Sequence, residues 1–314
     1  MMDGQAKDHH WGWSAALVAS LFAGALTLLY AGHKIDYEWH WARIPDFFIT
    51  HTQETVISPI NGQVTMLEKQ SVQLKTMTGE IQTLPVPNTE SLKVGQEIFE
   101  GDTLASAAVW RTGPLLKGLW VTLWMSLVAG IMGFLFSIVI AFMRLSKNPL
   151  SHGLSTAYIE IVRGTPLLVQ LLIAYFFVGS LFNLDKHIAG LGALAFFAAA
   201  YFSEILRGGI LSIPHGQLEA ARALGLSQFQ SIRYLMLPMG IKRSLPALTG
   251  QMINLVKDSS LLSVIAVYDL TKAGREVASS TFASFEVWFT VALLYLIITF
   301  GLGKLSRTLE KRSC

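Results

Sequence analysis

The sequence predicts an all-α polytopic membrane protein with six transmembrane helices and a small extracytoplasmic β-rich insert. Of its 314 residues, 52% are hydrophobic and only 14% are charged, and the mean hydropathy is +0.47. An ordinary soluble domain carries about 25% charged residues. Charged and histidine side chains are also missing from three long windows, residues 11–32, 118–143 and 164–184. Each window matches one bilayer crossing, which takes about 20 apolar residues.

The first predicted membrane helix covers residues 11–32. The segment before it, residues 1–10, carries Lys7 as its only lysine or arginine, and we expect it in the cytoplasm. No small-residue cleavage site follows the apolar stretch, so it differs from a secretory signal peptide. We therefore interpret residues 11–32 as a helix that stays in the mature protein.

Residues 33–112 differ in composition from the rest of the chain and predict strands. Asn61-Gly62 separates two alternating apolar and polar runs, and a second block at 92–105 has glycines at turn positions. The stretch from Lys34 to Arg111 contains six Lys or Arg and ten Asp or Glu, and this acidic excess is consistent with export. We expect an extracytoplasmic module at about 52–105.

Five further membrane helices are expected over residues 118–143, 164–184, from 188 past 204, 244–268 and 287–303. The fourth places Glu204 and Arg207 on one helical face. Short loops rich in Lys and Arg stay in the cytoplasm. The segment from Glu204 to Pro246 has five such cations against two Glu, and the end of the chain from Lys304 has four against one. Both termini, including the tail 306–314, are therefore predicted to be cytoplasmic.

The predicted cytoplasmic loop, residues 214–240, contains two short helix-forming segments. Gln217–Leu224 favours a helix that ends at Gly225, which can take the left-handed conformation of a helix C-terminus. A second helix over Ser227–Leu235, with its serine as N-cap, is expected to end at Pro238. Such an elbow would be a rigid, partly apolar docking knob. Periodicity alone equally allows a simple interfacial connection between two membrane helices.

The spacing in this loop resembles the signature loop of ABC importer permeases. Glu219-Ala220-Ala221 is followed after three residues by Gly225, and after nine more by Leu235-Met236-Leu237-Pro238. Residues 160–170, 201–209 and 254–261 resemble the polar amino-acid branch of that family, the histidine/glutamine/glutamate type. The resemblance covers about residues 113–305. It implies a five-helix permease core, here preceded by one additional N-terminal helix.

The resemblance implies a transmembrane subunit of an ATP-driven importer of polar amino acids, and not an enzyme. In agreement, no Gly-x-x-x-x-Gly-Lys-Ser/Thr loop occurs in the chain. No catalytic residue, cofactor or metal site is expected here, because ATP and Mg would bind to a partner ATPase. The implied partners are two ATPase subunits, a second permease that is identical or paralogous, an extracytoplasmic solute-binding protein and the lipid bilayer. We expect no nucleic acid partner, and a bacterial inner-membrane location.

The same resemblance assigns a role to residues of the predicted cytoplasmic loop. The implied ATPase-coupling residues are Glu219, Ala220, Ala221, Gly225, Leu237 and Pro238.

The fifth predicted membrane helix contains two ionic residues, Lys257 and Asp258. Charge at the bilayer centre costs on the order of 2.5 to 3.5 kcal/mol, so these side chains need protein or water around them. We expect a substrate path lined by Asn254, Lys257, Asp258 and Ser259, with Glu204 or Gln170 nearby. Alternatively, these side chains only tie helices together.

Glu160 and Arg163 lie one helical turn apart at the mouth of the third predicted helix. Side chains with this spacing are neighbours on a helix surface. We expect them to form an interfacial salt bridge or a gate latch rather than a binding site.

The two β-rich blocks resemble the ends of a biotinyl/lipoyl-type β-sandwich half, as also found in membrane-fusion proteins of efflux systems. Carrier families present a lysine in a Met-Lys hairpin, and nothing here matches it, so we expect a structural or partner-docking module. Two other functions remain as alternatives. A secondary transporter or channel would need no docking elbow, and a structural adaptor of an efflux assembly would need a long helical hairpin.

Overall fold

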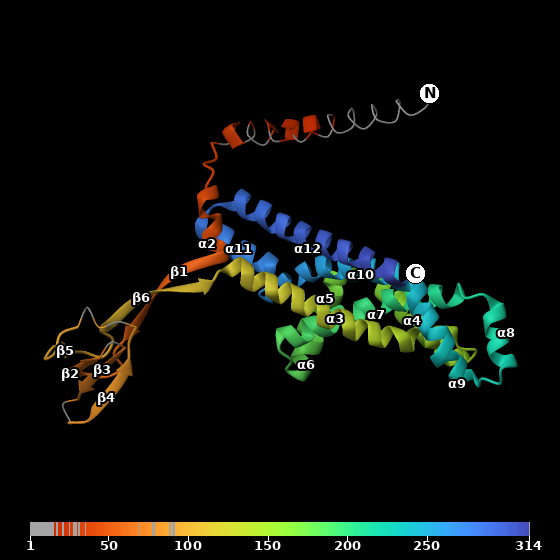
Figure 1. The fold of residues 1–314 in the computed structure, drawn as a ribbon, viewed down its shortest axis with the longest axis horizontal. Helices are drawn as coiled ribbons and strands as arrows, with labels where there is room; N and C mark the ends of the chain where they lie inside the picture. The colour runs from red at the N-terminus through yellow and green to blue at the C-terminus, as the bar shows by residue number, and fades with distance from the viewer. Residues whose placement is uncertain are drawn as a thin grey trace. The chain divides into compact units, whose positions relative to one another are not determined.

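A computed structural model describes residues 16, 18–20, 22–24, 26–27, 30, 32–34, 36–68, 70–76, 79–87, 89 and 92–313 (Figure 1). The chain divides into two compact units, residues 1–43 and 44–314. The predicted cytoplasmic segment 1–10 and much of the first predicted membrane helix lie outside the described residues. Those described between 16 and 34 have helical backbone, and a 3₁₀ turn, η1 (Trp41–Arg43), closes this unit.

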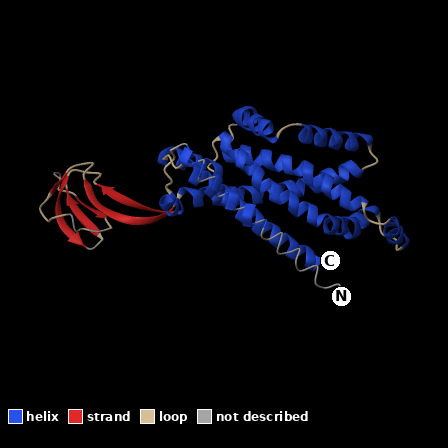
Figure 2. Ribbon diagram, turned by 90° about the horizontal axis from the view of Figure 1, so that it is seen from above, coloured by secondary structure: helices blue, strands red, loops and turns tan. Residues whose placement is uncertain are grey.

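The second unit begins with a short helix, α2 (Ile44–Phe48), and six strands. The strands are β1 (Ile49–Ile57), β2 (Gly62–Glu68), β3 (Ser71–Lys75), β4 (Ile81–Pro85), β5 (Glu97–Ile98) and β6 (Thr103–Thr112). β1 and β6 form an antiparallel two-stranded ribbon, whose register runs from Ile49 opposite Thr112 to Ile57 opposite Thr103. The remaining strands form a sheet in the order β4-β3-β2-β5. Figure 2 shows the strands in red and, joined to them by the ribbon, the helices in blue.

The predicted turn at Asn61-Gly62 does connect two strands, but they do not form a hairpin with each other. β1 pairs with β6, whereas β2 pairs with β3 and β5. The Asn61 side chain accepts a hydrogen bond of 2.6 Å from the Glu100 amide, which holds this corner to a distant turn. Gly95 and Gly101 have φ angles of 91° and 93°, as glycines at turns can adopt.

Helices make up the rest of the chain. They are α3 (Pro114–Leu145), α4 (Pro149–Gly164), α5 (Leu167–Leu172), the π-helix η2 (Ile173–Gly179), α6 (Ser180–Phe182), α7 (Lys186–Leu211), α8 (His215–Ala223), α9 (Gln228–Ser231), the π turn η3 (Ile232–Met236), α10 (Leu237–Asp258), the 3₁₀-helix η4 (Ser259–Ile265), α11 (Leu270–Thr281) and α12 (Ser284–Ser313).

Among the described residues, three helices are long and apolar enough to cross a membrane: α3, α7 and the 284–308 part of α12. They coincide with the second, fourth and sixth predicted membrane helices. The third predicted window, 164–184, is not one straight helix. α4 and the helical stretch 167–182 are bent by 105° at Thr165-Pro166, because proline disfavours helical backbone in the residue before it.

The fifth predicted membrane helix differs from its expected bounds. α10 begins at Leu237, and the chain tightens into η4 after Asp258, before Ala266 adopts a positive φ of 60°. α11 follows as a separate amphipathic helix that the sequence pattern did not predict. Its N-cap is Asp269, whose carboxylate accepts a hydrogen bond of 2.8 Å from the Lys272 amide.

The helical core packs α3 against α7 through small residues. A side chain on Gly133 would lie 2.7 Å from the Ala198 methyl, and one on Gly190 would lie 2.7 Å from Leu262 in η4. Small residues at such contacts let helix backbones approach closely, which is how membrane helices associate where no hydrophobic effect drives them together. Met125, Leu194 and Leu255 are fully buried in this core.

Candidate functional site

The loop between α7 and α10 folds into the predicted elbow. α8 ends where Gly225 takes a φ of 79°, and the Gly225 and Leu226 amides donate to the carbonyls of Arg222 and Ala221. This is a Schellman motif, and it satisfies carbonyls that the helix end leaves free. The prediction that Gly225 adopts the left-handed conformation is confirmed.

The second arm of the elbow begins as predicted at Ser227. Its hydroxyl accepts from the Gln230 amide, and the Gln230 side chain accepts in return from the Ser227 amide at 2.8 Å, forming a capping box. The prediction that Pro238 ends this arm is wrong. Helical backbone continues from Gln228 through the π turn η3 into α10, and Pro238 lies directly after this π turn, which changes the hydrogen-bonding pattern before it.

The elbow exposes several apolar side chains. Leu224 is 82% exposed, Phe229 69% and Tyr234 66%. Of the predicted coupling residues, Glu219, Ala220, Gly225 and Pro238 are exposed, Ala221 is buried, and Leu237 is partly buried against the cluster of Ala141, Leu206 and Ile210. Sequence reasoning missed Leu224 and Phe229 as exposed apolar groups of the elbow. An apolar residue on each side of the Gly225 turn is the sequence feature that could have indicated them.

The base of the elbow is held together by contacts between α7 and α10. Arg243 donates to the Ser212 carbonyl, and the Ser244 hydroxyl donates to the Ile205 carbonyl at 3.1 Å. Side chains on Gly209 or Gly240 would collide with Ser244 or Ile210 across the same contact. A displacement of the elbow would therefore be transmitted to two long helices together.

Glu204 is the centre of a charged cluster contributed by three helices. Arg207 donates to both carboxylate oxygens of Glu204, with Nε–Oε1 of 2.9 Å and Nη2–Oε2 of 3.0 Å. Arg144 Nε, from the end of α3, lies 3.6 Å from Oε1, and Arg163 Nη1, from the end of α4, lies 3.9 Å from Oε2. The Glu204 side chain is only 19% exposed. The cluster therefore joins the ends of α3 and α4 to α7.

The expected salt bridge between Glu160 and Arg163 is not present. Glu160 is exposed and, within the described residues, makes no ion pair. Arg163 instead reaches Glu204, and its guanidinium lies 5.4 Å from the centre of the Tyr201 ring. On α7, Glu204 offers a less exposed carboxylate and Tyr201 an aromatic face. Arg163 therefore contacts these two residues and not the solvated carboxylate of Glu160 one turn away.

Gln170 has a structural position at the break between α4 and α5. Its amide nitrogen donates to the Val162 carbonyl at 2.7 Å and to the Thr165 carbonyl at 3.1 Å. These carbonyls belong to the end of α4, where helical partners are lost. The same side chain borders an apolar cavity of about 600 Å³ between α5, η2 and α7.

The polar end of α10 contains the other predicted path residues. Asn254 and Lys257 are exposed, Asp258 is half-buried, and Ser259 is buried with its hydroxyl donating to the Val256 carbonyl at 2.8 Å. In the part of the chain that the structure describes, Lys257 and Asp258 form no hydrogen bond or ion pair with another helix. Within the described residues, Lys257 and Asp258 therefore do not connect α10 to another helix by such a bond.

Comparison with known proteins gives one family. Residues 116–312 match the model of the binding-protein-dependent transport system inner membrane component. The glutamine transport system permease protein GlnP of Escherichia coli strain K12 is 39% identical over 210 residues, which are 66% of this chain and 96% of that protein. The histidine/lysine/arginine/ornithine transport system permease protein HisM of Salmonella typhimurium is 34% identical, over 65% of this chain and 92% of the relative.

Solved structures agree with the sequence comparison. The crystal structure of an amino acid ABC transporter with histidines has a chain 37% identical to this one, with a TM-score of 0.59 over 63% of this chain and 94% of that one. The inward-facing MetNI methionine ABC transporter has 22% identity and a TM-score of 0.58, and it supports the fold alone. The resemblance to ABC importer permeases is confirmed. The strands β1–β6 precede the matched residues.

Proposed function

The chain belongs to the family of binding-protein-dependent transport system inner membrane components, and we propose that it is the membrane-spanning subunit of an ATP-driven importer of polar amino acids. The observation that carries this proposal is the match of residues 116–312, which includes the elbow at α8–α9. The relatives are named as permeases for glutamine and for basic amino acids, which supports a polar amino acid as the solute.

In this proposal the elbow is the coupling element. A partner ATPase, which supplies the ATP and Mg chemistry, docks on the exposed apolar side chains of Leu224 and Phe229 and on the surface around Glu219. Two such ATPases serve this chain and a second permease, identical or paralogous. Because α7 and α10 are joined at the elbow base, closure of the ATPase pair moves both helices as a unit. Such rigid-body motion between two states gives alternating access.

The path for the solute runs along the polar end of α10. Asn254, Lys257 and Asp258 have no partners on other described helices, which supports a role in meeting the ammonium and carboxylate groups of an amino acid. Ser259 is instead a structural residue, since its hydroxyl is used within its own helix. Glu204 acts as a latch between α3, α4 and α7, and Gln170 stabilises the α4–α5 break.

We further propose six membrane helices with both termini in the cytoplasm of a bacterium, in its inner membrane. The strands β1–β6 then lie outside and help to receive an extracytoplasmic solute-binding protein. The ribbon pair Thr55 and Ser106 allows a clean test. Residues 56–105 are replaced by an Asn-Gly turn, which suits a two-residue hairpin loop. Loss of stimulation by the binding protein supports the assignment, whereas unchanged uptake kinetics would contradict it.

The proposed function is tested by pull-down of the tagged full chain from its native membrane, with mass spectrometry of the co-purifying proteins. The wild type should bring down an ATPase. Gly225→Asp should lose it, because the substitution adds a charge beside the exposed apolar side chain of Leu224 and replaces a glycine that has a positive φ. Gly153→Asp is the control, since Gly153 is a helical glycine with open space around it. If no ATPase accompanies the wild type, gradient-driven transport becomes the better explanation.

A further inference from the structure

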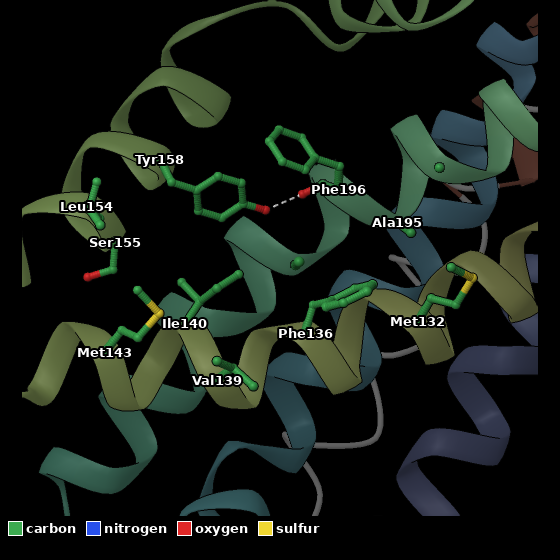
Figure 3. A pocket seen from close by; sticks show the side chains of 12 residues that line it. Met132, Phe136, Val139, Ile140, Met143, Leu154, Ser155, Tyr158, Ala195 and Phe196 are labelled. Atoms are coloured by element: carbon green, nitrogen blue, oxygen red, sulfur yellow. Dashed lines mark hydrogen bonds between the residues drawn. The ribbon is translucent and has the colours of Figure 1, made fainter. Parts of the chain in front are cut away.

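A groove lined almost entirely by apolar side chains lies between α3, α4 and α7, with a volume of about 620 Å³ (Figure 3). The lining runs from Met132 to Met143 on α3, from Leu154 to Tyr158 on α4, and from Gly192 to Ala199 on α7. We propose that this groove, the acyl groove, holds one acyl chain of an anionic phospholipid. The lipid headgroup would lie at the connection between α3 and α4.

The length of the groove matches one leaflet of a bilayer. From Met132 to Met143, α3 rises by about 16 Å. The hydrocarbon of one leaflet is about 15 Å deep, half of the full core. The groove ends next to Arg144, and cations of this kind mark the edge of the hydrocarbon region. An acyl chain lying along α3 would therefore run from the headgroup level to the middle of the bilayer.

The groove offers hydrocarbon contacts and no free polar group. The Tyr158 hydroxyl donates to the Phe196 carbonyl at 2.5 Å, shown as a dashed line in Figure 3. The Ser155 hydroxyl donates to the His152 carbonyl at 3.0 Å. A polar solute would lose hydration here without gaining hydrogen bonds, so the transported amino acid is not the ligand. Phe136 and Phe196 are more than half exposed, so the groove opens to the outside of the helix bundle.

The charge at the mouth of the groove favours an anionic headgroup. Lys147 lies four residues after Met143, in the connection between α3 and α4, is exposed and makes no ion pair within the described residues. Arg144 is already engaged by Glu204. α4 begins beside Lys147, so the positive end of its dipole points to the same place. A basic side chain at the membrane surface attracts anionic lipid.

Gly192 keeps the acyl groove open and provides the test. A Cβ placed on this residue meets no atom within 4 Å, so the backbone leaves room for a side chain, and Gly192→Leu places apolar atoms in the groove. Gly301 on α12 is an exposed helical glycine with the same open surroundings and lies outside the groove. Gly301→Leu is therefore the matched control for the loss of a helical glycine.

The full chain is reconstituted with equal amounts of phosphatidylglycerol and phosphatidylethanolamine, extracted in mild detergent, and the retained lipid is measured by mass spectrometry. Wild type and Gly301→Leu should retain phosphatidylglycerol stoichiometrically, and Gly192→Leu should lose it. Lys147→Ala should still bind lipid but prefer phosphatidylglycerol about fivefold less. Equal melting temperatures for the two leucine variants would show that loss of lipid is not loss of fold.

Two results would overturn the proposal. One is equal lipid retention by Gly192→Leu and wild type. The other is a second copy of the chain in the groove. Leu154→Cys, in a chain that carries Cys314→Ser, reports on that occupant. A disulfide between copies would place a second chain at this wall of the groove, where the acyl chain is assigned, and would contradict the lipid.

Discussion

The carboxylate of Glu204 receives two hydrogen bonds from one guanidinium, that of Arg207, while Arg144 and Arg163 approach it from two other helices. A bidentate pair of this kind has fixed geometry as well as charge. The outer arginines do not compete for the two hydrogen bonds, but they bring two more positive charges to the same carboxylate. The ends of α3, α4 and α7 are therefore held in one arrangement by a single acidic side chain.

Glu204→Gln should destabilise the protein. The substitution leaves three guanidinium groups beside a neutral amide, and hydrogen bonds to charged groups contribute about 1.5–3 kcal/mol each. We expect thermal melting in detergent to fall by several degrees. Glu160→Gln is the control, because Glu160 is exposed and unpaired within the described residues, and it should change the melting temperature little. Equal melting of both variants would contradict the latch assignment.

Phe229→Ala should weaken coupling to the ATPase without unfolding the chain. The side chain is 69% exposed on the elbow, so its loss removes docking surface and little internal packing. Buried aromatic anchors at interfaces commonly contribute 2 kcal/mol or more, which corresponds to about a thirtyfold loss of affinity. Solute-stimulated ATP hydrolysis measures the effect. Phe300→Ala, another exposed phenylalanine on α12, should leave hydrolysis at the wild-type rate.

Gln170→Ala should lower stability and leave the apparent affinity for solute unchanged. Truncation removes the donor of the partly buried Val162 carbonyl at the α4–α5 break, and such a hydrogen bond contributes about 0.5–1.5 kcal/mol net. Gln217→Ala, on the exposed surface of α8, is the comparison. A raised KM for uptake at normal melting temperature would instead place Gln170 in the substrate path.

Asp269 should make stability depend on pH. Burial raises the pKa of its carboxyl from 3.8 to about 6, against the opposing hydrogen bond from the Lys272 amide. The folded state then binds the proton more tightly than the unfolded state. Its contribution to stability is fully present below pH 3.8 and is lost as the pH rises to about 6. Asp269→Asn keeps an N-cap acceptor and should remove this slope from melting curves recorded between these pH values.

Local chemistry made the elbow predictable. The left-handed Gly225 and the capping Ser227 depend on residues within one helical turn, so the sequence contains their cause. The prediction that a helix ends at Pro238 was wrong because the preceding π turn changes the hydrogen-bonding pattern. That π turn has no short sequence signal. The pairing of Glu204 with Arg207 follows from their spacing, whereas its other two partners come from distant helices.

Long-range pairing limited the prediction elsewhere. The alternating runs around Asn61-Gly62 indicated strands, but which strands pair depends on the fold of the whole segment, and β1 pairs with β6 instead. α11 was missed because its twelve residues are too few and too polar to look like a membrane helix. The Asp269 N-cap was the available signal for it.

The two-stranded ribbon has a consequence for how such a chain is assembled. Ile49 and Thr112 are paired neighbours, and the Gly113 amide donates to the Phe48 carbonyl at 2.7 Å, so the β-rich segment leaves and rejoins the helical part at one point. A segment whose two ends meet is a self-contained cassette. It can be grafted into a host, exchanged or excised without altering the spacing of the host's own elements, as tolerated domain insertions are.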